Sequence, residues 1–276
     1  MTDLRRHPWN TSFVWSTPRG PFRRVTEEQA AHFDEHGFVV LEDLVDRKTL
    51  ADITAELDSF EANVEAFLRT QTDERFTIAE AGAITFTTHL VAQSEIARRF
   101  ATAPVFLDIC ADLLALDVDM YWDQAVYKKP EKPRRFPWHQ DNGYTFIEPQ
   151  QYLTIWVALT DATIENGCPW VAPGVHKVGT LAHRFVDPLG FECFDKAPSA
   201  VAAPVPAGGA VVFSSLTPHL TGPNTTDAVR KAYILQYSQA GSMILQGDPE
   251  AGPATRRVPA DEPARQFPVL RRGQPV

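Results

Sequence analysis

The sequence contains few cysteines, and they follow no recognisable pattern. Its 276 residues include Cys110, Cys168 and Cys193, with no CxxC or other metal-binding spacing among them. Because the number is odd and the spacing irregular, we do not expect a disulfide framework, and we expect a reducing cytoplasm as the location. Each cysteine is interpreted as a small buried apolar residue.

An excess of positive charge and a long apolar run are also missing. The 35 acidic residues outnumber the 26 lysines and arginines, which gives a formal net charge of -9. Binding to a phosphate backbone requires a basic surface, so nucleic acid is excluded as a partner. No apolar run approaches the length that spans a bilayer, and residues 1–6 lead into polar Asn10-Thr11-Ser12 instead of the apolar core of a signal peptide. We therefore expect no membrane partner and no targeting segment.

The composition that is present fits one sizeable domain. The chain is 44% hydrophobic, enough to build a single core at this length. We predict an irregular arm over residues 1–25, a single domain over residues 26–247, and a tail over residues 248–276. The tail is dense in proline and arginine, and we expect it to be loop.

The first half of the chain carries helix signals. Thr26-Glu-Glu-Gln29 is a capping-box pattern whose helix is predicted to end at Gly37, before a short buried strand over residues 38–41. Asp46 is predicted to cap a second helix, and residues 94–116 form a further helical stretch that Pro104 should divide in two. The second helix should bury one stripe, formed by Leu50, Ile53, Leu57, Phe60, Val64 and Phe67.

The second half changes to short segments rich in β-branched and aromatic residues, separated by Gly, Pro and Asn. We predict strands over residues 120–127, 152–159, 201–205, 210–213 and 231–238. A helical first half followed by antiparallel strands predicts an α+β protein, in which helices from the N-terminal half buttress a sandwich or barrel.

Trp138-His-Gln-Asp-Asn-Gly-Tyr144 contains the most informative pattern, His139-x-Asp141. Residues two apart in a strand point to the same side, so both side chains are predicted to face one cavity. The third ligand must then come from elsewhere, and His219 is the best candidate because it follows the strand at residues 210–213. Two imidazoles and one carboxylate can hold three adjacent corners of an iron(II) octahedron and leave the opposite face open.

Arg230 completes this set. It stands at the start of the strand at residues 231–238 and shares its side with Ala232, Ile234 and Gln236, which we interpret as the inward face. A guanidinium offers the two-pronged contact that a carboxylate of 2-oxoglutarate needs deep in a pocket.

These residues and several linked motifs resemble the phytanoyl-CoA dioxygenase family of iron(II)- and 2-oxoglutarate-dependent oxygenases. The resemblance covers roughly residues 26–240. The motifs that carry it are Phe33-Asp-Glu-His-Gly-Phe-Val-Val-Leu41, Tyr127-Lys-Lys-Pro130, Trp138-His-Gln-Asp141, Asn166-Gly-Cys168, Ala172-Pro-Gly-Val-His176 and His219-Leu-Thr-Gly-Pro-Asn224, followed by Thr226 and Arg230-Lys-Ala232.

The resemblance implies a fold, a cofactor set and residue roles. The fold would be a double-stranded β-helix, the cupin-like jelly-roll, and the domain at residues 26–247 would use Fe(II), 2-oxoglutarate and O2. His139, Asp141 and His219 would ligate the metal. Arg230 would pair with the distal carboxylate of 2-oxoglutarate beside Thr221, while Gln124 and Trp156 would line the co-substrate pocket.

Substrate-lining residues are predicted from position and type. Trp122, Asn142, Tyr144, Trp170 and His176 are expected around the pocket, which favours an apolar or ring-containing small molecule. Gln140, Asn142 and Tyr144 are also candidates to orient the metal ligands.

The predicted reaction is hydroxylation of a small metabolite in specialised metabolism. Halogenating relatives have a small residue in place of Asp141, so the retained carboxylate argues against halogenation. Desaturation, epoxidation and rearrangement remain open. Two other classes also remain: a metal-dependent hydrolase that uses the same three ligands, which would leave Arg230 without a role, and a noncatalytic binding module on the same barrel. No pattern indicates the oligomeric state.

Overall fold

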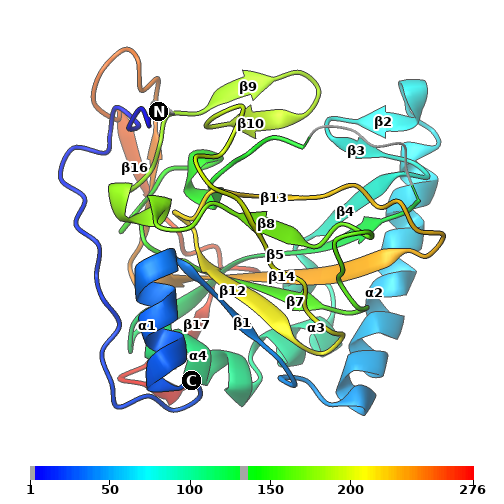
Figure 1. Cartoon of the computed structure of the whole chain (residues 1–276), viewed down its shortest axis with the longest axis horizontal. Coiled ribbons are helices and arrows are strands. Elements are labelled where there is room, and N and C mark those ends of the chain that lie inside the picture. Colours follow the sequence, from blue (N-terminus) through cyan, green and yellow to red (C-terminus); the bar gives the residue numbers. More distant parts are fainter. Residues whose placement is uncertain (1–3, 131–135) are drawn as a thin grey trace.

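The computed structural model describes residues 4–130 and 136–276 (Figure 1). Within these ranges, two antiparallel sheets enclose one core and helices cover the outer face of the larger sheet. The fold is the predicted double-stranded β-helix of the α+β class. None of the helices in the described ranges is long and apolar enough to span a membrane.

The first helix and strand follow from local sequence signals. Helix α1 (Glu27–His36) begins at a capping box in which Thr26 and Gln29 exchange side-chain and backbone hydrogen bonds. It ends at Gly37, whose φ of 82° lies in the left-handed region that favours glycine. Strand β1 (Phe38–Leu41) follows directly. The predicted boundaries of both elements are confirmed.

Helix α2 (Arg47–Leu68) is capped by Asp46, whose carboxylate accepts hydrogen bonds from the backbone N–H groups of Lys48 and Thr49. The predicted stripe is correct at Ile53 and Leu57 but wrong at its end. Phe67 is 51% exposed and Leu68 is buried instead. The reason is that Leu68, four positions after Val64, lies on the same face of the helix as Val64.

Helices α3 (Glu95–Ala101) and α4 (Pro104–Leu113) divide at Pro104 as predicted. Proline is tolerated in the first turn of a helix because its missing N–H would have no partner there. Helix α2 packs against β4 and β5, and α4 packs against β7. The helices thus bury the outer face of the large sheet.

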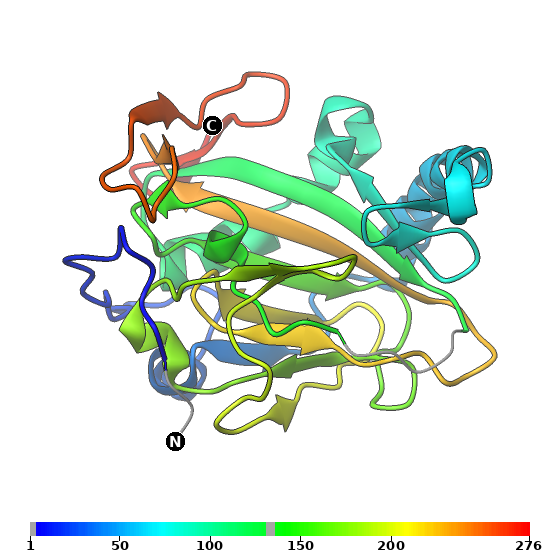
Figure 2. The ribbon, with the colours of Figure 1, turned by 90° about the horizontal axis from the view of Figure 1, so that it is seen from above.

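The large sheet has the strand order β1-β12-β7-β14-β5-β4-β3-β2. Its long neighbours β5 (Val118–Lys128) and β14 (Arg230–Gln239) run side by side through the centre of the molecule (Figure 2). The other members are β2 (Arg75–Phe76), β3 (Ala79–Glu80), β4 (Ile84–Thr88), β7 (Leu153–Ala158) and β12 (Ala210–Ser214).

A smaller sheet faces the large one and has the order β11-β8-β13. Its strands are β8 (Pro169–Val171), β11 (Val201–Ala202) and β13 (His219–Thr221). Short ribbons at the periphery are β6 (Ile147–Glu148), β15 (Met243–Gln246) and β16 (Arg256–Pro259), and the hairpin β9 (Arg184–Val186) and β10 (Gly190–Glu192). Between the two main sheets lies an inner cluster that contains Phe38, Ile84, Trp156 and Phe213.

The tail is not the loop that its composition predicted. Besides β16, it contains β17 (Pro268–Arg271) and β18 (Gln274–Pro275), and β17 pairs with the start of β5. Val269 and Leu270 are buried against the core. Proline is compatible with the first residue of an edge strand, so a proline-rich composition did not exclude pairing here.

Residues 4–25 contain no helix or regular strand, as predicted, but they are bound to the domain. The carboxylate of Asp112 on α4 accepts hydrogen bonds from the backbone N–H groups of Arg23, Arg24 and Val25. The side chain of Asn10 donates to the carbonyl oxygens of Val178 and Thr180.

Candidate metal centre

The two predicted ligand segments lie side by side. The backbone N–H of His139 donates to the carbonyl oxygen of His219 at 3.1 Å, and the reciprocal bond is 2.8 Å long. The sequence predicted that Asp141 continues the strand of His139, but the structure does not show this. Asp141 begins the 3-10 turn η3 (Asp141–Gly143), so a turn, and not strand alternation, brings its carboxylate to the same place.

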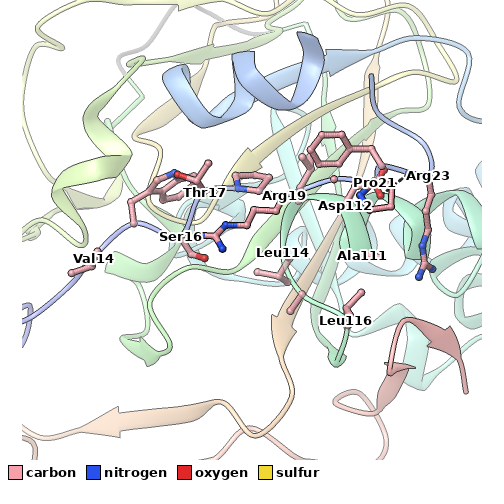
Figure 3. Close-up of a pocket in the computed structure, with 16 residues that line it drawn as sticks. Val14, Ser16, Thr17, Arg19, Pro21, Arg23, Ala111, Asp112, Leu114 and Leu116 are labelled. Atoms are coloured by element: carbon pink, nitrogen blue, oxygen red, sulfur yellow. Dashed lines mark hydrogen bonds between the residues drawn. The ribbon is translucent and has the colours of Figure 1, made fainter. Parts of the chain in front are cut away.

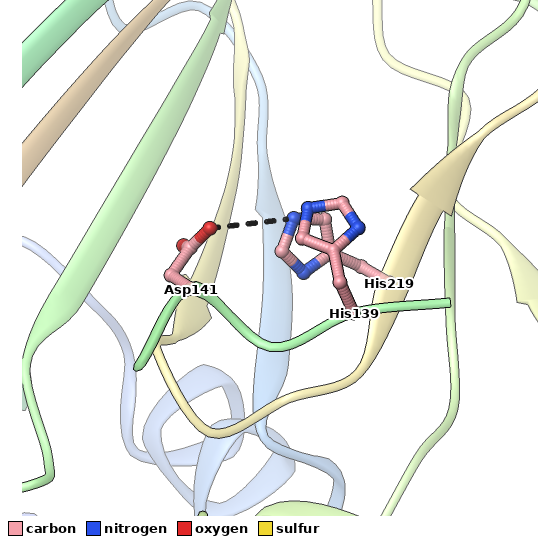
Figure 4. Close-up of side chains that lie close together, drawn as sticks. All are labelled: His139, Asp141 and His219. Atoms are coloured by element: carbon pink, nitrogen blue, oxygen red, sulfur yellow. Dashed lines mark ion pairs between the residues drawn. The ribbon is translucent and has the colours of Figure 1, made fainter. Parts of the chain in front are cut away.

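The side chains of His139, Asp141 and His219 point toward one another (Figure 4). Their potential ligand atoms all lie within 4.8 Å of one another. Nε2 of His219 is 3.7 Å from Oδ1 of Asp141, and the two imidazole centroids are 4.3 Å apart. The three side chains are therefore close enough together to hold one metal ion.

Hydrogen bonds around the imidazoles fit a metal on their Nε2 side. Nδ1 of His139 is 3.1 Å from the carbonyl oxygen of Pro137, and Nδ1 of His219 is 3.0 Å from that of Thr217. A carbonyl oxygen only accepts, so each Nδ1 carries the hydrogen and each Nε2 keeps its lone pair. Both rings are therefore in the tautomer that a metal ion requires.

Asp141 is held by one of its two oxygens. The hydroxyl of Thr154 on β7 donates to Oδ2 at 2.6 Å, while Oδ1 faces His219. The amide of Gln236 donates to the same hydroxyl at 3.4 Å. This arrangement presents a single carboxylate oxygen to the ion, and it leaves part of the coordination sphere open.

Burial sets the charge of the ligands. Desolvation lowers the pKa of both His139 and His219 to about 4, so the imidazoles are neutral at physiological pH. Desolvation also raises the pKa of the Asp141 carboxyl, while the proximity of His139 and the hydrogen bond from Thr154 oppose that rise. A divalent cation would favour the ionised carboxylate and the neutral rings together.

A cavity of about 550 Å³ opens beside these ligands. Five of the residues predicted around the pocket line it: Thr221, Gln124, Trp156, Trp122 and Tyr144. Sequence reasoning missed further lining residues, among them Thr154, Tyr121, Tyr152 and Phe86. Thr154 could have been found, because it shares strand parity with Trp156 on β7.

Arg230 lies behind the cavity wall. Its side chain is buried, its guanidinium carbon is 5.0 Å from the ring centroid of Trp156, and Nη1 donates to the carbonyl oxygen of Val126 at 3.4 Å. Its register partner on β5 is Lys128, whose buried Nζ is 3.4 Å from the hydroxyl oxygen of Thr221. Two cationic residues therefore occupy paired positions at one end of the cavity.

Three predicted substrate-lining residues lie outside the residues that form this cavity. The amide of Asn142 is buried and donates to the hydroxyl of Thr180 at 2.7 Å. Trp170 alternates with the cavity residue Pro169 on β8, so its side chain is on the other face of the strand. His176 packs edge-on against Trp15 of the arm.

A larger cavity, of about 960 Å³, shares no lining residue with the first (Figure 3). It is formed by residues 14–23 of the arm and residues 111–116 at the end of α4. Its one carboxylate, Asp112, is occupied by backbone N–H groups of the arm. Among the described residues that line this cavity, no further carboxylate is present to bind an ion.

Comparison with protein families agrees with this site. The model of the phytanoyl-CoA dioxygenase family matches residues 33–232, which contain all three candidate ligands and Arg230. Phytanoyl-CoA dioxygenase domain-containing protein 1 of Danio rerio is 24% identical over 269 residues, covering 80% of this chain and 92% of that protein.

Solved structures share the fold. EvdO2 from Micromonospora carbonacea var. aurantiaca, crystallised with 2-oxoglutarate, is 26% identical with a TM-score of 0.60, covering 79% of this chain and 93% of that chain. The epimerase SnoN, crystallised with Fe3+, alpha ketoglutarate and nogalamycin RO, is 21% identical with a TM-score of 0.60 and covers 85% of this chain and 98% of that chain.

Proposed function

Because this chain belongs to the phytanoyl-CoA dioxygenase family, whose members are iron- and 2-oxoglutarate-dependent oxygenases, we propose that it hydroxylates an unactivated C–H bond of a small metabolite and releases succinate and CO2. One observation carries the proposal: the ligand atoms of His139, Asp141 and His219 converge within 4.8 Å beside a cavity. The set matches the two-histidine, one-carboxylate facial triad of iron(II) oxygenases.

The residues present fit the implied group. His139, Asp141 and His219 would hold the iron, which with 2-oxoglutarate and O2 supplies the oxidant for the C–H bond. Arg230 would pair with the distal carboxylate of 2-oxoglutarate, and the hydroxyl of Thr221, which lines the cavity, would be a further donor. Gln124 and Trp156 line the same cavity and would limit the water that reaches the co-substrate.

Asp141 favours hydroxylation over halogenation. Its carboxylate is present, aimed at His219 and held by Thr154, so the position that a halide would need in the ligand set is filled. The same carboxylate supports iron(II) as the bound metal in preference to softer metal ions, because oxygen and imidazole ligands suit iron(II).

The cavity supports a neutral, ring-containing substrate. Aromatic side chains of Phe86, Trp122 and Tyr144 provide flat apolar surfaces, and the phenols of Tyr121 and Tyr152 offer uncharged hydrogen-bonding groups. Burial raises the pKa of Tyr121 to about 12, so its phenol stays neutral. Apart from histidines and tyrosines, Asp141 is the one titratable residue among the described residues that line this cavity.

Anaerobic reconstitution with iron(II) and 2-oxoglutarate tests the cofactor assignment. We expect the weak visible charge-transfer band of the chelated co-substrate with the wild-type protein and no band with Asp141→Ala. A wild-type protein that shows no band, and that Asp141→Ala leaves unchanged, would contradict the assignment.

A turnover screen tests the reaction. Succinate formation is followed across a metabolite library, and the molecular mass of each product is measured by mass spectrometry after a reaction under ¹⁸O2. Hydroxylation predicts the gain of one labelled oxygen atom, desaturation the loss of two hydrogens, and rearrangement or epimerisation no change in mass. Product formation without 2-oxoglutarate and O2 would support a hydrolase, and 2-oxoglutarate left unconverted throughout would support a binding module.

A further inference from the structure

The segment between the two N-terminal ligands is held by a distant stretch of chain. Residues 179–183, here called the strap, connect the turn that ends at Gly179 with the β9–β10 hairpin. Strap residues Thr180 and Leu181 are buried. Hydrogen bonds connect the strap to the loop that carries His139 and Asp141.

Gln140, which stands between the two ligands, points into the strap and is fully buried. Its amide nitrogen donates to the carbonyl oxygens of Gly179 at 3.0 Å and Leu216 at 2.6 Å. Its amide oxygen accepts from the backbone N–H of Leu181 at 2.6 Å. These bonds fix the side chain of Gln140. Its backbone carbonyl oxygen accepts from the N–H of Gly143 at 2.9 Å, so its backbone N–H is the group that remains to be held by another contact.

That contact is made by His183. The backbone N–H of Gln140 donates to Nε2 of His183 at 3.0 Å, and Nδ1 lies 2.9 Å from the carbonyl oxygen of Leu181. A backbone N–H only donates and a carbonyl only accepts, so the ring is neutral and carries its hydrogen on Nδ1. Burial lowers the pKa of His183 to about 4, which agrees with the neutral ring.

The ring of His183 also packs against the turn that follows Asp141. A Cβ atom placed on Gly143 would be 2.1 Å from Cε1 of His183, which explains why this position has no side chain. The ring thus contacts the ligand loop on both sides of Asp141: at Gln140 through a hydrogen bond and at Gly143 through van der Waals contact.

We propose that His183 is a positioning residue for the metal centre, which sets the direction of the peptide between His139 and Asp141 and so the distance between their ligand atoms. This inference rests on the metal site of the proposed function. His183 itself contacts neither ligand side chain through a hydrogen bond, and its effect is on the pre-organisation of the site before metal binds.

Two matched substitutions separate the two nitrogens of His183. In His183→Gln, the amide reaches the position of Nε2 and its oxygen can accept from the N–H of Gln140. In His183→Asn, the shorter amide reaches the position of Nδ1, where it can donate to Leu181, and the acceptor for Gln140 is lost. The two variants therefore keep opposite halves of the interaction while both remove the ring.

The measurement is Co2+ affinity of the metal-free protein, followed by the visible d–d absorption of the bound ion, with the free energy of unfolding of the metal-free protein measured in parallel. We expect His183→Asn to bind Co2+ about 10- to 100-fold more weakly than the wild type, the usual effect of losing a group that orients a metal ligand, and His183→Gln to retain most of the affinity. We expect similar unfolding free energies for the two variants.

A double-mutant cycle with Gly143 provides an independent check. Gly143→Ala alone should displace the ring and weaken Co2+ binding, whereas Gly143→Ala in the His183→Ala background should add little further loss. Equal Co2+ affinities for the Asn and Gln variants, or strictly additive losses in the cycle, would overturn the role of His183. A wild-type protein that binds no Co2+ would instead overturn the metal site itself.

Discussion

Replacement of Thr154 by valine tests how the protein orients the Asp141 carboxylate. The Thr154 hydroxyl donates to Oδ2 of Asp141 at 2.6 Å, and Thr154 is buried on the floor of the cavity. Valine keeps the β-branched shape on β7 and removes the donor. The change therefore deletes one hydrogen bond to a ligand with little change in packing.

The expected magnitude follows from the charge of the acceptor. A hydrogen bond to a charged group contributes about 1.5–3 kcal/mol, and each 1.4 kcal/mol corresponds to about tenfold in affinity. The amide of Gln236 lies beside Thr154 and also lowers the pKa of Asp141, so it can replace part of the lost contact. We therefore expect metal affinity to fall by about tenfold, at the lower end of the range for such residues.

The assay is an anaerobic titration of the metal-free protein with iron(II) in the presence of 2-oxoglutarate, read at the charge-transfer band. Thr87→Val is the matched control. Thr87 is buried on β4, and its hydroxyl has no hydrogen-bond partner among the described residues, so the same substitution there should leave iron affinity unchanged.

If Thr154→Val bound iron as tightly as the wild type does, the reasoning would be refuted, because the hydroxyl would then not orient the Asp141 carboxylate. An equal loss in Thr87→Val would refute it as well, since the effect would then come from the sheet and not from the bond to Asp141. The combined variant Thr154→Val with Gln236→Leu should lose more affinity than Thr154→Val alone.

Three further predictions follow from the same structure. Arg230→Gln should raise the KM for 2-oxoglutarate by at least about tenfold, because it removes a charged contact to the distal carboxylate; steady-state succinate assays measure this, and an unchanged KM would exclude the pairing. Trp122→Ala should raise the KM for the substrate identified in the screen while the KM for 2-oxoglutarate stays constant, because Trp122 lines the cavity; a change in the 2-oxoglutarate constant alone would contradict this. The metal-free protein should lose stability as the pH falls from about 6.5 toward 4: burial lowers the pKa of His139, His176 and His219 to about 4, so in this window the unfolded chain binds protons that the folded chain does not. Denaturant unfolding at pH 7 and pH 5 measures this loss of stability. The variant His176→Gln keeps a donor toward the carbonyl oxygen of Asp34, and it should lose less stability between the two pH values than the wild type. A free energy of unfolding that does not depend on pH would show that these rings are not held neutral.

Local signals determined much of the fold before any tertiary contact is considered. The capping box at Thr26, the cap at Asp46 and the break at Pro104 act within a few residues, so the helix boundaries were predictable. The resemblance to the family implied that Gln124 and Trp156 line a pocket, and both of them line the cavity.

The identity of the ligand set was also readable, but the reason for its geometry was not. A strand was predicted to align His139 with Asp141, whereas a 3-10 turn does so. Such a turn is fixed by partners outside its own segment, here His183 of the strap, 43 residues from Gln140, and Thr154, 13 residues from Asp141. Spacing along the sequence carries no information about contacts of that range.

Tertiary structure alone decided the remaining features. Asn142 and His176 have the polarity of site residues, but their hydrogen bonds point them into the strap and toward α1. The tail has the composition of a loop, yet the open edge of β5 offers its backbone hydrogen-bond partners. The sequence by itself specified which groups can bind a metal and a keto acid. The packing of distant segments determined which of those groups meet, because burial and hydrogen bonding fix the direction of a side chain that its own sequence leaves free.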